Sequence, residues 1–278
     1  MTDLPRLTRR ALLAIATTAL LCPAVIAQES GPAYTNADEL LVALETADEG
    51  VKTLRCNIVH TKLFAIAGDL QQRRGALVYT TDPRQRFSIS FEQELNNDQV
   101  HTGERVYIFD GEWLVEKDPA AREFVKTRIV QPGESFDPLR IGEGPFPIPI
   151  GQKRDEILER FSAELAPAGA GLDDFEAQAN AAESSGWIQL HLTPTPLFGE
   201  ETDLTDVRVW YDRDDLLPRM AKTVNRIGDE SLVYLYSVKK NDETVEAEFS
   251  VETPGDDENW NVTLRDRTGV AAQIEVTP

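Results

Sequence analysis

The alternation of apolar and polar residues predicts that most of the chain forms β-strands. Phe87, Ile89 and Phe91 fall on one face of an extended segment, and the serines between them fall on the other. Short segments of this type, separated by turn residues, are expected at 55–66, 74–81, 86–95, 104–110, 113–117, 123–130, 187–193, 205–212, 217–226, 231–239 and 244–251. This meander of eleven short strands predicts one large curved antiparallel sheet or an open barrel.

The segment 105–119 is predicted to be a hairpin, because Asp110-Gly111 separates two apolar runs and suits a type I′ turn. Both faces of this hairpin are apolar: Tyr107 and Phe109 alternate with Val106 and Ile108. A sheet with one wet face alternates more cleanly. We therefore expect the second face to be covered by the chain termini or by an inserted segment, or to stay partly exposed.

One amphipathic helix is predicted near the N-terminal end of the strand region. Asn36 followed by Glu39 resembles a capping box, and Gly50 ends the pattern. Its apolar stripe requires an apolar partner and consists of Ala37, Leu40, Leu41, Leu44 and Ala47.

Two segments interrupt the strands. In 141–165 a run rich in glycine and proline precedes a helix expected at about 152–165, with Ile157, Leu158 and Phe161 on one side. The stretch 166–186 is rich in alanine and glycine and is expected to be a surface insertion with at most one short helix. From about residue 255 the tail turns polar, and it is a candidate for an edge strand.

The first 27 residues have the features of an export signal. A basic pair, Arg9-Arg10, precedes an apolar run too short to span a membrane, and small residues around Ala27 mark a cleavage site. The segment 8–13 resembles a twin-arginine signal, with an ordinary secretory signal as the alternative. A lipoprotein signal at Cys22 is disfavoured because Leu21 precedes it. We expect cleavage after Ala27, a periplasmic protein, and one domain over 28–278.

The formal net charge of −20 argues against nucleic acid and against docking on anionic lipid. After cleavage one cysteine remains, Cys56, which is expected to be a small buried apolar residue.

Motifs for chemistry are missing from the sequence. It contains no Gly-x-Ser-x-Gly, His-Glu-x-x-His, Walker or Cys-x-x-Cys motif. The three histidines, His60, His101 and His191, are isolated, and acid pairs such as Asp214-Asp215 and Asp256-Asp257 are interpreted as solvated turn charge. We therefore expect no enzyme, no cofactor and no metal, although a glycan-acting β enzyme stays an alternative.

The order of segments resembles the periplasmic carriers of outer-membrane lipoproteins, the LolA-like or lipoprotein-sorting family. The resemblance covers about 36–256 and rests on five quoted stretches taken together: VKTLRCNIVHTK, RRGALVYTTDPRQRFSISFEQE, FDGEWLVEKDP, VRVWYDRDDLLPRMAK and AEFSVETPGD. It implies a fold that is mainly β with some α: an unclosed half-barrel of about eleven antiparallel strands with covering or lid helices.

The resemblance also implies a function and a site. The family's cavity holds acyl chains, so the implied ligand is an acylated lipoprotein or lipid. Membrane donor and acceptor proteins are the further partners, and a monomer is expected. The implied cavity residues are Phe87, Ile89, Phe91, Leu40, Leu41, Leu44, Ile157 and Phe161, with 141–165 as a movable lid.

One departure from the family concerns its lid latch, an arginine just before the proline of a turn. Here Asp82 stands at that position, and the nearest arginines are Arg84 and Arg86. The alternative function is a lipid- or protein-sensing envelope module on the same fold.

Overall fold

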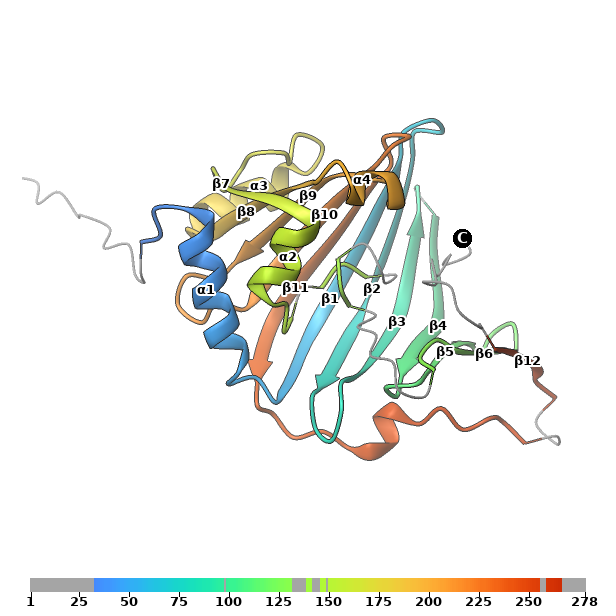
Figure 1. The fold of residues 1–278 in the computed structure, drawn as a ribbon. Coiled ribbons are helices and arrows are strands. Elements are labelled where there is room, and N and C mark those ends of the chain that lie inside the picture. The colour runs from blue at the N-terminus through green and yellow to red at the C-terminus, as the bar shows by residue number, and fades with distance from the viewer. Residues whose placement is uncertain are drawn as a thin grey trace, which may run out of the picture.

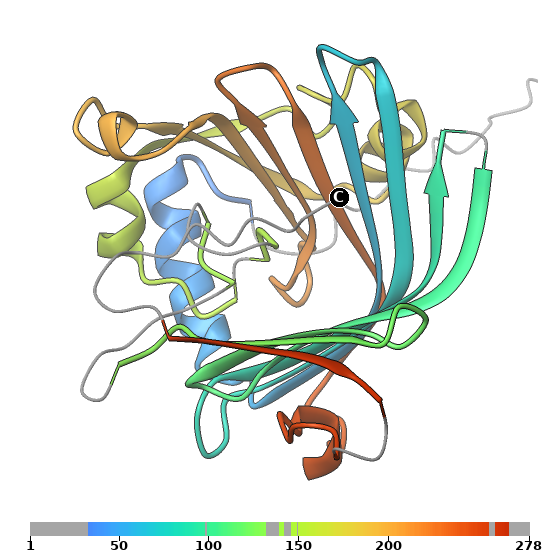
Figure 2. The ribbon, with the colours of Figure 1, turned by 90° about the vertical axis from the view of Figure 1, so that its right-hand side faces the viewer.

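The structure is a computed structural model that describes residues 33–97, 99–131, 139–141, 146–148, 150–255 and 259–266. The predicted export signal, its cleavage site, Cys22 and the pair Asp256-Asp257 lie outside the described residues. In the described part, one curved sheet of 12 strands wraps around two helices (Figures 1 and 2). The sheet does not close into a barrel, because β12 and β7 stand at opposite ends of the strand order.

The strand order is β12-β6-β5-β4-β3-β2-β1-β11-β10-β9-β8-β7. The strands are β1 (Thr53–Phe64), β2 (Asp69–Thr80), β3 (Arg86–Asn96), β4 (Gln99–Phe109), β5 (Trp113–Asp118), β6 (Glu123–Arg128), β7 (Phe161–Ala166), β8 (Ile188–Pro194), β9 (Leu204–Tyr211), β10 (Pro218–Asn225), β11 (Glu230–Lys240) and β12 (Asn261–Asp266). Neighbours are antiparallel except β12, which lies parallel to β6 at the edge. The expectation of a curved, unclosed antiparallel sheet is confirmed, and so is the edge strand in the tail.

The helices are α1 (Ala37–Asp48), α2 (Arg154–Arg160), α3 (Glu176–Ser184), α4 (Phe198–Glu201) and the 3₁₀ turn η1 (Glu246–Phe249). Helix α1 begins as predicted, because the Asn36 side chain accepts a hydrogen bond from the Glu39 N–H. The Glu39 carboxylate accepts from the Thr35 N–H instead of the Asn36 N–H, so the capping box is shifted by one residue. Helices α1 and α2 lie inside the curve of the sheet (Figure 2).

The helix predicted at 152–165 is only half as long as expected. Helix α2 ends at Arg160, and Phe161 begins β7, which pairs with β8. The segment 161–166 suits both structures, since Phe161, Ala163 and Leu165 recur every second residue. The free edge of β8 decided the outcome, because pairing there satisfies the backbone hydrogen bonds of the segment.

The hairpin predicted at 105–119 forms between β4 and β5, but its turn is not type I′. Asp110 N–H bonds to the carbonyl of Trp113, which makes Gly111 and Glu112 the central residues, and only Gly111 has positive φ, at 98°. The Asp110 carboxylate also accepts from the Glu112 and Trp113 N–H groups. The side chain of Asp110 thus stabilises the turn from outside its centre.

The second apolar face of this hairpin is covered by the C-terminal segment. The strand predicted at 244–251 is instead the 3₁₀ turn η1, which contacts β3 and β4. Phe249 is buried beneath it, with its ring centroid 4.6 Å from the guanidinium carbon of Arg86. Lys126 on β6 donates to the carbonyl of Val251 at 2.9 Å. Of the candidates for cover, the C-terminal segment is therefore the correct one here.

The segment 166–186 packs on the convex side of the sheet. It contains one short helix, α3, as expected. Gln189 on β8 donates to the carbonyls of Pro167 and Ala170, and Trp210 on β9 donates to that of Ala168. Its apolar contacts form a separate cluster of Leu172, Phe175, Ala182, Trp187, Trp210, Met220 and Leu232.

None of the helices in the described ranges has the length and apolar character needed to cross a membrane.

Candidate ligand-binding site

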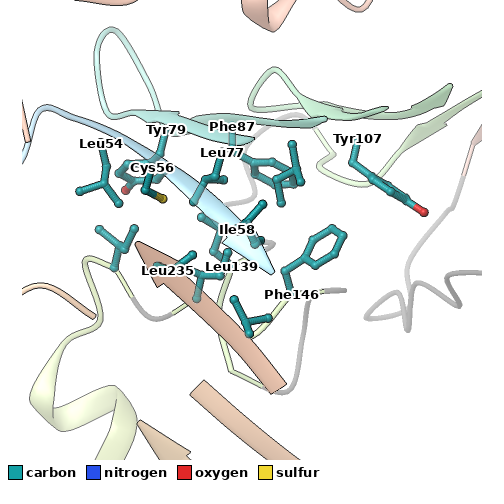
Figure 3. Close-up of a cluster of buried hydrophobic side chains, with 14 of the residues drawn as sticks. Leu54, Cys56, Ile58, Leu77, Tyr79, Phe87, Tyr107, Leu139, Phe146 and Leu235 are labelled. Atoms are coloured by element: carbon teal, nitrogen blue, oxygen red, sulfur yellow. The ribbon is translucent and has the colours of Figure 1, made fainter. Parts of the chain in front are cut away.

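The concave side of β1–β5 carries a continuous apolar surface. Figure 3 shows Leu54, Cys56 and Ile58 from β1 facing the same space as Leu77 and Phe87 from the neighbouring strands. The alternation in the sequence produces this surface, because every second residue of a strand points to the same face. Burial raises the pKa of the Cys56 thiol to about 12, so this cysteine is an inert apolar residue, as predicted.

Non-strand residues cover this surface from inside the curve. They form what we call the inner segment: 139–141, 146–148 and 150. Its apolar side chains are each at most 1% exposed: Leu139, Ile141, Phe146, Ile148 and Ile150. Figure 3 shows Leu139 and Phe146 pointing toward the strand residues across the space. The chain therefore fills its own concave surface with side chains from loops.

Phe146 occupies the centre of an aromatic cluster. Its ring centroid lies 5.3 Å from that of Tyr107, 5.5 Å from His60 and 5.8 Å from Phe91. The contacts with Tyr107 and His60 are edge-on, a favourable arrangement for aromatic rings.

The structure separates the predicted site residues into two groups. Phe87, Ile89 and Phe91 belong to the cluster that meets Phe146, Ile148 and Ile150. The other five, together with Ile141, belong to a second cluster on β7–β10: Leu40, Leu41, Leu44, Ile157 and Phe161. All eight are buried, but they do not line one common surface.

Sequence reasoning assigned 141–165 to a lid and missed which residues of it would be buried. The run Phe146-Pro147-Ile148-Pro149-Ile150 carried the signal, because an apolar residue recurs at every second position. The Ile148 N–H donates to the Phe146 carbonyl and the Ile150 N–H donates to the Ile148 carbonyl, both at 2.9 Å, so the chain makes tight turns here and is not extended. Gly142, Gly144, Pro145 and Pro149 lie outside the described residues.

The expected departure at the latch is visible in the structure. Arg86 donates to the carbonyl of Asp82 and pairs with Glu246 on the outer face. Arg84 lies 3.8 Å from a carboxylate oxygen of Asp110. Among the described contacts of these three residues, none reaches the inner segment.

Among the described residues, no group of three or more His, Cys, Asp or Glu side chains is arranged so that it could hold a metal ion. His60 lies inside the curve, with Nε2 2.9 Å from the Ser231 hydroxyl, and burial lowers its pKa to about 3. His191 is on the convex side between Glu164 and Asp206, at 2.8 and 2.7 Å. Asp215 lies in a turn and pairs with Arg219, as expected for a turn acid.

No protein-family model and no curated protein matches the sequence. Solved structures do resemble the fold. An uncharacterized conserved protein from Thermus thermophilus matches with a TM-score of 0.45 and 10% identity, over 83% of this chain and 99% of the other. A putative outer membrane lipoprotein-sorting protein domain from Vibrio parahaemolyticus matches with a TM-score of 0.38 and 14% identity, over 76% of this chain and 95% of the other. A LolA superfamily protein from Nitrosomonas europaea matches with a TM-score of 0.31 and 12% identity, over 76% of this chain and 96% of the other.

The names of the last two structures are those of the family that the ordered segments of this sequence resemble.

Proposed function

We propose that the protein is a periplasmic carrier that binds the acyl chains of a lipoprotein or another lipidated molecule on its concave apolar surface. The observation that carries the proposal is the cover on that surface. Four large apolar side chains from loops occupy it: Leu139, Phe146, Ile148 and Ile150. A covering segment made of loops can leave without breaking any strand pairing, whereas a second sheet could not.

The free energy lost by displacing the four loop side chains is comparable to the free energy gained by burying one acyl chain. Removing four large side chains from an apolar site costs roughly 6–12 kcal/mol, at about 1.5–3 kcal/mol each. A chain of about 16 methylenes recovers about 13 kcal/mol at roughly 0.8 kcal/mol per buried CH₂. One acyl chain therefore roughly balances the inner segment, and a ligand with two or three chains displaces it.

This proposal gives the predicted lid a more specific role. The residues that have to move are Leu139, Phe146, Ile148 and Ile150, while Ile141 and α2 stay docked on the second cluster, α2 through Ile157. The acidic chain suits a carrier that must not adhere to anionic membranes, since its net charge is −20.

The test is binding of a synthetic triacylated lipopeptide, measured by native mass spectrometry, with amide hydrogen exchange on the same samples. We expect one lipopeptide per chain, and faster exchange over 139–150 when it is bound. Phe146→Ala removes one competing side chain, so it should tighten binding about tenfold. Leu197→Ala is the control, because Leu197 is an exposed loop residue on another part of the molecule.

Failure of both wild type and Phe146→Ala to bind any acylated peptide would reject the carrier function. Binding with unchanged exchange over 139–150 would retain acyl-chain binding but place it elsewhere.

A further inference from the structure

The concave face changes from apolar to polar along its strands. On β1 the side chains that point inward are Cys56 and Ile58, then His60 and Lys62. Arg73 on β2 lies directly opposite His60, and Glu94 on β3 lies opposite Arg73. Phe146 lies at the boundary, since its ring contacts His60.

Arg73 is the unusual residue of this polar end. Its side chain is 3% exposed, and its Nε donates to Glu94 at 2.9 Å. Its Nη2 is also buried but donates no hydrogen bond to any described group. A buried guanidinium nitrogen without an acceptor is costly, so the site lacks an acceptor that a ligand would supply.

A second cation faces the same place. Burial, and then the nearby charge of Arg73, lower the pKa of Lys62. Burial, and then the charges of Lys62 and Arg73, lower the pKa of His60. Asp229, in the turn between β10 and β11, is the carboxylate that acts on Lys62, but it lies beyond ion-pair distance in the described structure. The local field at His60 is therefore positive, inside a chain whose net charge is −20.

An open pocket of about 330 Å³ lies over the ends of β3 and β4, and it reaches this polar end through Glu94, the partner of Arg73. Phe91, Glu94 and Arg105 contribute to its wall, and Arg105 pairs with Asp118 at 3.0 Å. Each arginine of this end thus has one carboxylate partner, while Lys62 has none within ion-pair distance among the described residues.

We propose that Arg73 and Lys62 bind the anionic head group of the acyl-chain ligand, a carboxylate or a phosphate. The inference rests on the proposed function, because the acyl chain takes the place of Phe146 and its head then lies beside His60. Arg73 donates Nη2–H to the anion, and Lys62 supplies the second positive charge. Charge-assisted hydrogen bonds of this type are about twice as strong as neutral ones.

The test compares three ligands with the same chain: hexadecanol, hexadecanoate and hexadecyl phosphate. Each competes with the lipopeptide at concentrations below its solubility limit and, for the two anions, below the critical micelle concentration. We expect at least one of the two anions to bind about tenfold or more tightly than the alcohol, because one charged hydrogen bond contributes that much. The two anionic arms distinguish a carboxylate head from a phosphate head.

Variants assign the preference to residues. Arg73→Gln and Lys62→Gln should each reduce the preference for the anion to about threefold or less, with the affinity for the alcohol unchanged. Lys62→Gln leaves no carboxylate without its partner, so this variant tests the head-group site even if Arg73→Gln folds poorly. Arg74→Gln is the matched control: the neighbouring side chain is exposed and bonds to Gln72.

Equal binding of alcohol and anions by wild type would overturn the head-group site while leaving the carrier function intact. The head-group site is also overturned if the preference survives in both variants, or if only the lipopeptide binds. If no acylated ligand binds at all, the carrier function fails and this inference fails with it.

Discussion

The carboxylate of Asp48, the last residue of α1, accepts a hydrogen bond from the Gly151 N–H at 2.8 Å. Gly151 directly follows the inner segment, so this bond ties that segment to α1. Burial raises the pKa of Asp48 from 3.8 to about 6, against the opposing effect of the bond from Gly151. The tie is therefore made by a carboxylate that would be more stable protonated.

Asp48→Asn should stabilise the protein at neutral pH. A raised carboxyl pKa contributes stability that is fully present below pH 3.8 and is lost as the pH rises through 6. Asparagine keeps an acceptor for Gly151 and carries no charge. We expect a gain of up to about 3 kcal/mol at pH 7.5 that disappears near pH 4, measured by urea unfolding at both values.

Glu45→Gln on the same helix is the control for this variant. Glu45 is exposed, so its substitution should change the free energy of unfolding by less than about 0.5 kcal/mol at either pH. Destabilisation by Asp48→Asn at pH 7.5 would mean that the charged carboxylate is the stabilising form.

Phe249→Ala should show that η1 is part of the folded core. Phe249 is 3% exposed and covers Arg86, so its truncation leaves a cavity above a buried guanidinium. We expect a loss of about 3 kcal/mol in thermal or urea unfolding. Val245→Ala, four residues earlier and 61% exposed, should cost less than about 0.5 kcal/mol. Equal effects of the two substitutions would argue against a packed C-terminal cover.

Gly75→Ala tests the close approach of β2 and β3. The register between these strands shifts beside Gly75, and a Cβ there would lie 1.8 Å from the carbonyl oxygen of Ser90. The strands have to separate to admit it, so we expect a loss of more than about 2 kcal/mol.

Gly103→Ala is the matched substitution on β4, where a Cβ meets no atom within 4 Å. It should be neutral, or stabilising by about 0.5 kcal/mol, because alanine restricts the unfolded chain. A wild-type melting temperature for Gly75→Ala would show that the strands yield at this point.

Local patterns in the sequence determined the elements that bury one face by themselves. The alternation of Phe87, Ile89 and Phe91 predicted β3 and its inward face, and Asn36 predicted the first residue of α1, since both signals lie within a few residues. The unclosed sheet followed from the number and order of such strands.

Tertiary structure decided the elements whose pattern fits two conformations or whose partner is distant in sequence. Phe161 became the start of a strand because β8 offered an unpaired edge, and 246–249 became a turn because Phe249 packs on Arg86, which is far away in the chain. Packing between residues that are distant in sequence also separates the predicted site residues into two clusters, and it places Phe146 beside His60. Which loop residues fill a concave surface depends on long-range packing, which a pattern of neighbours cannot determine.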